Sequence, residues 1–162
     1  MSRLLEKKIQ DLRKLKKLIP YLKARRKKIV FTNGCFDLLH YGHVKYLQDA
    51  KKKGDILVVG INNDASVKRI KGKRRPIVNE KDRLRIVAAL ESVDYVVLFK
   101  EDTPLKIIKF IKPAVLVKGA DWNKNNIVGK NFVISYGGRF STIKFVKGYS
   151  TSNLIKKIAK RF

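Results

Sequence analysis

Short apolar runs along the chain alternate with stretches that carry helical spacing or helix-capping residues. The apolar runs predict five buried strands, over residues 29–32, 56–61, 95–99, 114–117 and 142–146. The stretches between them predict helices over residues 42–53, 79–90, 103–111 and 127–136, and a closing helix that starts near residue 150. This alternation predicts an α/β fold, with a doubly wound five-stranded parallel sheet in a single domain.

A leading segment precedes the first predicted strand. Its apolar residues recur at helical spacing among lysines and arginines: Leu5, Ile9, Leu12, Leu15, Ile19 and Leu22. This spacing predicts a basic amphipathic helix within residues 1–24, which Pro20 should stop or kink, before a main domain over residues 25–162. We expect the leading helix to cover the core of that domain; a contact in a homodimer is the alternative role.

The chain is strongly basic, with 39 Lys and Arg against 13 Asp and Glu and a formal net charge of +26. Such a field attracts nucleotides, sugar phosphates and nucleic acid alike. The excess is spread along the chain and is not gathered in one recognition helix, although residues 68–76 predict a markedly basic loop. The charge therefore does not choose a partner, and a nucleic-acid-binding α/β domain stays an alternative.

The cysteine count and the hydropathy of the chain limit the kinds of site and the cell compartment to be expected. Cys35 is the one cysteine, which excludes an internal disulfide, and with only two histidines beside it a four-ligand structural zinc site is excluded as well. No apolar run approaches the roughly 18 residues of a membrane span. The first residues also lack the pattern of a secretory signal. We therefore expect a cytoplasmic protein that makes no membrane contact.

Both histidines of the chain, His40 and His43, follow the first predicted strand and open the next helix. In a Rossmann-like sheet of this kind, ligands bind at the carboxyl ends of the strands. A helix N-terminus there favours phosphate, imidazoles can donate hydrogen bonds to it, and Gly34 and Gly42 allow a close backbone approach. In the competing interpretation, His40 merely caps the helix and His43 packs against the sheet.

This segment resembles the signature of the nucleotidyltransferase superfamily, in which every fixed position matches: Gly34, Phe36, Asp37, His40, Gly42 and His43. Over residues 25–160 the chain is most similar to the heptose-1-phosphate adenylyltransferase branch, which makes ADP-heptose. The matching segments are residues 32–37, 62–69, 75–76, 89–94, 101–104, 116–122 and 149–155. The cytidylyltransferase branch usually carries arginine and glutamate where this chain has Lys147-Gly148-Tyr149, so a cytidylyltransferase acting on glycerol 3-phosphate is the second choice.

The resemblance implies transfer of AMP from ATP to a sugar 1-phosphate, with release of pyrophosphate. The other product, ADP-heptose, would then be used in lipopolysaccharide core biosynthesis. Small molecules would then be the partners, with no nucleic acid, and Mg²⁺ or another divalent ion would accompany ATP. His40, His43 and Lys118 would be catalytic. The implied nucleotide-binding residues are Thr32, Asn33, Gly34, Cys35, Phe36, Asp37, Gly42, Gly119, Asp121, Ser150, Thr151 and Ser152. The implied acceptor-binding residues are Asn62, Lys68, Lys71, Arg75 and Arg83, the last four gripping anions from a mobile loop.

Two points stay open at this stage. Asp37 has two candidate roles, orienting a histidine or helping to hold magnesium. A cysteine hydrolase, with Cys35 as nucleophile and His40 or His43 as base, is a further alternative.

Overall fold

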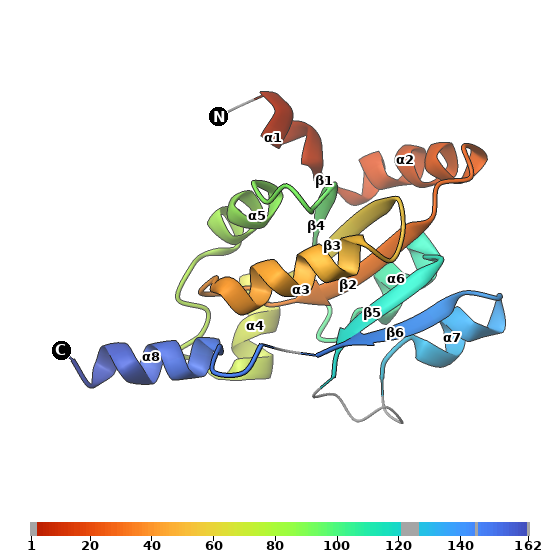
Figure 1. Cartoon of the computed structure of the whole chain (residues 1–162). Coiled ribbons are helices and arrows are strands. Elements are labelled where there is room, and N and C mark those ends of the chain that lie inside the picture. The colour runs from red at the N-terminus through yellow and green to blue at the C-terminus, as the bar shows by residue number, and fades with distance from the viewer. Residues whose placement is uncertain (1–2, 121–126, 145, 162) are drawn as a thin grey trace.

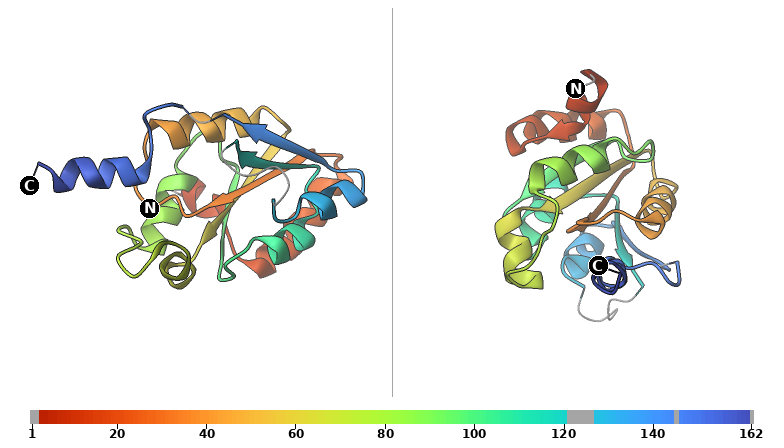
Figure 2. Two further views of the ribbon diagram at one scale, coloured as in Figure 1. Left: turned by 90° about the horizontal axis from the view of Figure 1, so that it is seen from below. Right: turned by 90° about the vertical axis from the view of Figure 1, so that its left-hand side faces the viewer.

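A computed structural model describes residues 3–120, 127–144 and 146–161 and shows a parallel sheet between two layers of helices (Figures 1 and 2). The sheet has six strands, in the order β1-β4-β3-β2-β5-β6. Their bounds are β1 Ile9–Gln10, β2 Ile29–Gly34, β3 Ile56–Asn62, β4 Tyr95–Phe99, β5 Val115–Gly119 and β6 Arg139–Ile143. The predicted α/β class is confirmed, whereas the predicted number of five strands is wrong.

The helices lie on both faces of the sheet. Their bounds are α1 Arg3–Lys8, α2 Leu12–Ala24, α3 Tyr41–Lys51, α4 Asp64–Lys71, α5 Glu80–Ala88, α6 Leu105–Ile111, α7 Lys130–Ser135 and α8 Thr151–Ala159. Side chains of α3 and α5 share one apolar cluster with the sheet, and those of α2, α6 and α7 share the cluster on the other face. Helix α8 buries no residue and projects from the body of the molecule (Figures 1 and 2).

The strands are apolar without interruption because both faces of the sheet are covered. In β2, Val30 points into the cluster beneath α3, while its neighbour Phe31 points into the cluster beneath α2 and α6. Leu57 and Val58 of β3 divide in the same way. Successive side chains of a strand point to opposite faces, so each apolar run supplies both halves of the core.

The sixth strand comes from the leading segment, where the sequence predicts one helix. Ile9 and Gln10 pair in parallel with Val96 and Val97 of β4 and interrupt the helical spacing with a short edge strand. Helix α2 then follows, and its N-cap is Asp11, whose carboxylate accepts a hydrogen bond of 2.7 Å from the backbone N–H of Lys14.

Helix α2 continues through Pro20 to Ala24, so the proline does not stop the helix. Ile19 and Leu22, on either side of the proline, are buried against the sheet together with Leu15. This packing outweighs the one hydrogen bond that a proline removes. The segment therefore covers the core, as we expect from its apolar spacing.

Three further boundaries differ from the prediction. The first half of the expected basic loop is helix α4, whose N-cap Asn63 accepts from the N–H of Ser66 and whose Val67 is buried. The N-cap of α6 is Pro104, not Thr103, and it makes no side-chain capping bond. The last strand starts at Arg139, earlier than expected, because Arg139 pairs with Val115 of β5.

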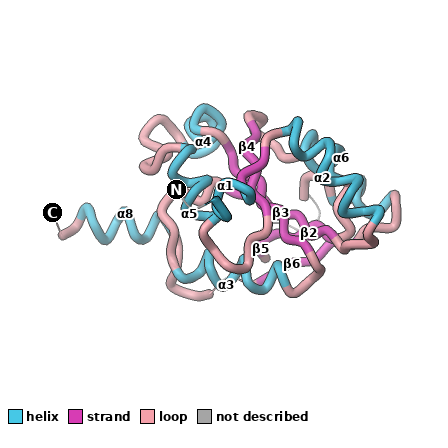
Figure 3. The backbone as a smooth tube through the Cα atoms, turned by 90° about the horizontal axis from the view of Figure 1, so that it is seen from above, coloured by secondary structure: helices cyan, strands magenta, loops and turns pink. Residues whose placement is uncertain are grey.

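The chain changes direction in the sheet at β2. It runs from β2 to β3 and β4 on one side and then returns to β5 on the other side of β2 (Figure 3). The carboxyl ends of β2 and β5 therefore flank the point where ligands bind in sheets of this type. Within the described ranges, no helix combines the length and the hydropathy needed to cross a membrane.

Candidate active site

Residues 34–43, which comprise the end of β2, the loop after it and the first turn of α3, are called the signature loop below. The chain leaves β2 at Gly34 and enters α3 at Tyr41, with His40 in the N-cap position. The side chain of His40 makes no capping hydrogen bond. Capping therefore does not account for this imidazole.

The rings of His40 and His43 stack on each other, with centroids 3.9 Å apart and planes 19° from parallel. Both Nδ1 atoms are buried, and neither has a hydrogen-bond partner in the described part of the chain. Buried polar atoms are almost always satisfied, so two neighbouring exceptions in a loop that opens a helix indicate a place for a ligand.

Burial also keeps both rings uncharged. It lowers the pKa of His40, and together with the neighbouring His40 it lowers the pKa of His43 from 6.5 to about 4. At neutral pH each ring is then a neutral imidazole with one N–H to donate. An anion bound beside them would raise both pKa values, because it favours the charged form of the ring.

The start of α8 lies against the signature loop. A Cβ added to Gly42 would lie 3.0 Å from the Cβ of Tyr149 and 3.1 Å from Nδ1 of His40, so no larger residue fits without movement. The hydroxyl of Thr151 donates to the carbonyl of Leu38 at 3.3 Å. Ser150 caps α8 by accepting from the N–H of Asn153, and Ser152 is exposed. The structure thus places Thr151 against the signature loop, whereas the ligand-binding roles of residues 150–152 stay predictions.

Lys118 and Asn33 meet where β5 and β2 end. The ammonium group of Lys118 donates to Oδ1 of Asn33, and its residue is only 7% exposed. Burial lowers the pKa of Lys118 to about 8. Gly119 is buried beside it at the end of β5, whereas the predicted nucleotide-binding residue Asp121 lies outside the described residues. A buried cation is therefore placed at the ligand-binding edge of the sheet.

Thr32 is buried and Cys35 is half-buried. The hydroxyl of Thr32 is buried and shares a 2.7 Å hydrogen bond with the hydroxyl of Tyr46 on α3, so only its backbone can line a pocket. Burial raises the pKa of the Cys35 thiol. A raised pKa disfavours the thiolate and argues against the cysteine hydrolase.

The carboxylate of Asp37 is bound by the segment between α4 and α5. This buried carboxylate accepts from Nε of Arg75 at 2.5 Å and from the backbone N–H groups of Ile77 and Val78 at 2.9 Å each. These three donors tie the segment after α4 to the signature loop. Arg75, predicted to bind the acceptor, is engaged in this ion pair.

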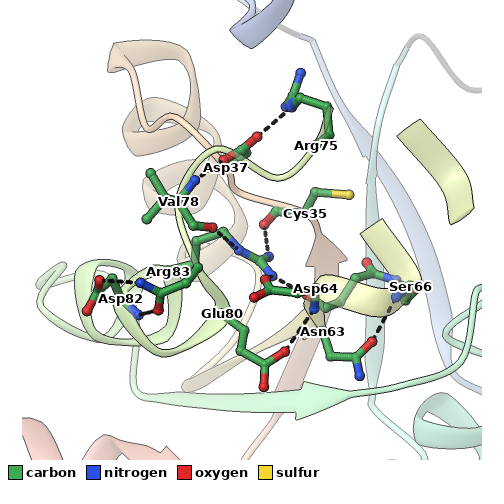
Figure 4. A network of polar contacts seen from close by, with 12 residues as sticks. Cys35, Asp37, Asn63, Asp64, Ser66, Arg75, Val78, Glu80, Asp82 and Arg83 are labelled. Carbon is green, nitrogen blue, oxygen red and sulfur yellow. Dashed lines mark hydrogen bonds and ion pairs between the residues drawn. The ribbon is translucent and has the colours of Figure 1, made fainter. Parts of the chain in front are cut away.

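Arg83 corrects the prediction of a mobile anion-binding residue. It lies in α5, not in a loop, and is fully buried (Figure 4). Its guanidinium donates to the carbonyls of Val78, Cys35 and Asn62 and to the carboxylate of Asp64. A group with no exposed surface cannot reach a substrate in this conformation, so its role is structural.

The remaining acceptor-binding predictions divide between the interior and the surface. The side chain of Asn62 is buried and donates to Ser66 and to the carbonyl of Glu101. Lys68 and Lys71 lie on α4 and are exposed. The structure therefore leaves these two lysines accessible and encloses Asn62 and Arg83.

Comparison with known proteins identifies the family. The model of the cytidylyltransferase-like family matches residues 31–157, which include the signature loop, Lys118 and the start of α8. The chain belongs to this family. The resemblance to the nucleotidyltransferase superfamily is thereby confirmed.

Similar proteins extend the match over nearly the whole chain. The bifunctional protein HldE of Geobacter metallireducens is 58% identical over 155 residues, which cover 96% of this chain and 32% of that protein. HldE of Helicobacter pylori is 54% identical over 146 residues, covering 90% and 31%. The chain thus spans about a third of the length of the curated relatives it matches. A crystal structure of the lipopolysaccharide core biosynthesis protein from Thermoplasma volcanium superposes with a TM-score of 0.61 at 29% identity, covering 76% of this chain and 99% of the other.

Sequence reasoning missed three side chains of this cytidylyltransferase-like site. Asp64 binds Arg83, and Glu80 accepts from the backbone N–H of Asp64 at 2.8 Å (Figure 4). Tyr149 places its ring 6.1 Å from His40. Asp64 comes shortly after a predicted strand, and this position could have marked it as a residue at the carboxyl edge of the sheet. Its partner Arg83 lies 19 residues away, however, and the two meet only because α5 packs against the sheet.

Proposed function

We propose that this domain transfers AMP from ATP to a sugar 1-phosphate, most specifically D-glycero-β-D-manno-heptose 1-phosphate, and releases pyrophosphate. The product, ADP-heptose, would serve lipopolysaccharide core biosynthesis. Membership of the cytidylyltransferase-like family supports the reaction class. Similarity to HldE proteins and to a lipopolysaccharide core biosynthesis protein supports the acceptor. The observation that carries the proposal is the stacked histidine pair with two buried, unpartnered Nδ1 atoms.

In the proposed reaction, a phosphate oxygen of the acceptor attacks the α-phosphorus of ATP in line with the bond to the bridging oxygen. The new P–O bond forms as the bond to pyrophosphate breaks, and no covalent enzyme intermediate is needed. The protein then contributes orientation and stabilisation of charge. His40 and His43, neutral before binding, donate N–H bonds to phosphate oxygens at the N-terminus of α3.

Lys118 supplies the buried positive charge that the histidines lack. Its bond to Asn33 fixes its position between the ends of β5 and β2. The first N–H groups of α8, with the hydroxyl of Ser150 or Thr151, would receive the β- and γ-phosphates. This assignment is supported by the contact between Thr151 and the carbonyl of Leu38 in the signature loop.

Mg²⁺ is expected to arrive with the nucleotide. Among residues whose placement is described, no three His, Cys, Asp or Glu side chains come together, and Asp37 already accepts three hydrogen bonds. We therefore assign no step to a metal held by protein side chains alone. The ion would bind the triphosphate oxygens and offset part of their charge.

A pyrophosphate-release screen tests the proposal. ATP and CTP are each combined with heptose 1-phosphate, glycerol 3-phosphate and ethanolamine phosphate in the presence of Mg²⁺. We expect release with ATP and heptose 1-phosphate, and none when the acceptor is omitted. Release with CTP and glycerol 3-phosphate alone would replace the adenylyl assignment by the cytidylyl one. No release with any pair would contradict the proposal.

The predicted cytoplasmic setting, the absence of a nucleic-acid partner and the homodimer stay predictions. A gel-shift titration with duplex and single-stranded DNA at near-physiological salt checks the second of these. We expect no shifted band, because a spread of surface lysines gives only salt-sensitive attraction. A stable, salt-resistant complex would favour the nucleic-acid-binding alternative.

A further inference from the structure

Phe36 has an unusual backbone conformation for its residue type. Its φ is +45°, in the left-handed region that a bulky side chain rarely adopts. Such a conformation persists only where the surroundings enforce it, and it concentrates at functional sites. The peptide groups that flank Phe36 belong to Cys35 and Asp37, and both of these residues are held by contacts from distant parts of the chain.

Arg83 holds the residue before Phe36. Its Nη1 donates to the carbonyl of Cys35, while Nε donates to the carbonyl of Val78 at 3.0 Å (Figure 4). Nη2 donates to the carbonyl of Asn62 and to Asp64, at 2.8 Å each. One guanidinium therefore joins the signature loop to the end of β3 and to the start of α5.

Asp37 holds the residue after Phe36. Its carboxylate is bound by Arg75 and by two backbone N–H groups of the segment that leads into α5. Arg83 reaches the same segment through the carbonyl of Val78. The two residues thus attach both sides of Phe36 to one short stretch of chain, residues 75–78.

The ring of Phe36 meets the histidine pair. It is 5% exposed and lies edge-on to His43, with centroids 5.4 Å apart and planes at 60°. A Cβ added to Gly34 would lie 3.0 Å from this ring, so the ring also fills the space beside the end of β2. His43 in turn stacks on His40.

We propose that Arg83 and Asp37 are positioning residues, which hold Phe36 in its left-handed conformation so that its ring fixes the plane of His43. Neither residue touches the substrate in this account. Both act through Phe36 on the imidazole that faces the phosphates. The effect on turnover rests on the proposed function, whereas the effect on the histidine ring does not.

The chemistry of the two side chains makes them hard to replace. A guanidinium presents five N–H donors in a fixed plane, and four of its hydrogen bonds are used here. A lysine keeps the charge but offers three donors from a single nitrogen, so it cannot reach all four acceptors. Asparagine at position 37 keeps one oxygen acceptor and loses both the charge and the second acceptor that Arg75 and the two N–H groups share.

The experiment compares Arg83→Lys with Arg85→Lys and Asp37→Asn with Asp102→Asn in the full chain without ligand. Arg85 lies on the same helix in an exposed 3.2 Å ion pair with Asp82, and Asp102 lies in an exposed pair with Arg69. Selective labelling of histidine and phenylalanine gives the ring resonances of His43 and its nuclear Overhauser contact with Phe36. We expect the contact to weaken and the His43 resonances to move in both test variants, and to stay unchanged in both controls.

Kinetics supply the second measurement. In both test variants we expect kcat for pyrophosphate release to fall about tenfold or more, because small misplacements of a catalytic group are costly, while KM for ATP changes by less than about threefold. A third variant, Phe36→Leu, removes the ring but keeps an apolar side chain, and it should reproduce the histidine shift with Arg83 and Asp37 intact.

The proposal is overturned if folded Arg83→Lys and Asp37→Asn keep the wild-type His43 resonances and the contact with Phe36. If Arg83→Lys does not fold, Asp37→Asn decides by the same resonances and the same contact. Should the wild-type protein release no pyrophosphate from any nucleotide, the proposed function fails, and the resonances of the ligand-free protein still decide the positioning role.

Discussion

Two regions of the molecule were predicted to bind anions, and the structure treats them differently. The signature loop carries no lysine or arginine, and its two imidazoles are neutral, with buried Nδ1 atoms that lack partners in the described chain. The end of α4 and the turn after it, residues 68–74, hold Lys68, Lys71, Lys73 and Arg74, all exposed. The region with the least charge therefore has the features of a binding site.

The difference arises because exposed lysines are fully hydrated, whereas the imidazoles are partly shielded from water. An exposed lysine already has its hydrogen bonds and its charge satisfied by solvent, and salt screens it over about 10 Å. The two imidazole rings are half-buried, so an N–H bond from either ring to a phosphate oxygen forms in a less polar setting and is stronger than the same bond in open water. We infer that residues 68–74 affect how often nucleotide arrives, whereas the signature loop affects what happens to it.

The largest loss of activity is expected when an imidazole of the signature loop is removed. We expect His43→Ala to lower kcat by about 10²-fold or more, as does the loss of one preorganised donor to a developing oxyanion. Steady-state pyrophosphate release measures the change, with Lys73→Ala as the matched substitution in the exposed region. A His43→Ala enzyme within about threefold of the wild type would remove the histidine from the mechanism.

Lys118 tests whether burial or charge matters more, because it is a cation that is buried near the signature loop. We expect Lys118→Met to lower kcat/KM roughly tenfold, the effect of losing a charged hydrogen bond to phosphate. Lys100→Met is the control, since Lys100 directly follows β4 and is exposed.

The pH dependence of kcat/KM gives a second check on Lys118. Its pKa is about 8, so the ammonium form that attracts phosphate is lost as the pH rises through 8. kcat/KM of the wild type should therefore decline above that pH, while the Lys118→Met profile should stay flat there. An identical decline in both proteins would assign it to another group.

Lys68→Ala combined with Lys71→Ala should have the smallest effect. We expect KM for ATP to rise by no more than about threefold at low salt and by nothing measurable at 0.5 M salt, because screened surface charges contribute little. kcat should not change. A salt-independent loss of kcat would show that these lysines touch the reacting groups.

Much of the fold follows from local pattern. The continuous apolar runs of β2, β3, β4 and β5 identify a buried parallel sheet, because only a sheet covered on both faces needs them. The edge strand β1 has two residues, Ile9 and Gln10, and lies within helical spacing, so no local signal separates it. Its pairing depends on the exposed edge of β4, which is a property of the assembled sheet.

In the candidate site, too, the features that depend on local sequence could be predicted, and those that depend on tertiary packing could not. Spacing and glycines place His40 and His43 at a strand-to-helix turn, and the structure confirms that placement. The sequence could not show that Arg83 is buried, because nothing in the local sequence distinguishes a buried arginine from a surface one until its hydrogen-bond acceptors are known. The four acceptors of Arg83 come from three parts of the chain that meet only when α5 packs on β3.

The most direct test of the account is a nucleotide titration followed by the imidazole resonances of the two histidines. In the free protein, the resonances of His43 should titrate with a pKa near 4, because its ring is buried and lies beside His40. Saturation with a nonhydrolysable ATP analogue and Mg²⁺ should move both rings and raise the pKa of His43 by about one unit or more. Calorimetry confirms that the analogue is bound. Bound nucleotide with unmoved histidine resonances and an unchanged pKa would contradict the claim that this pair holds the triphosphate.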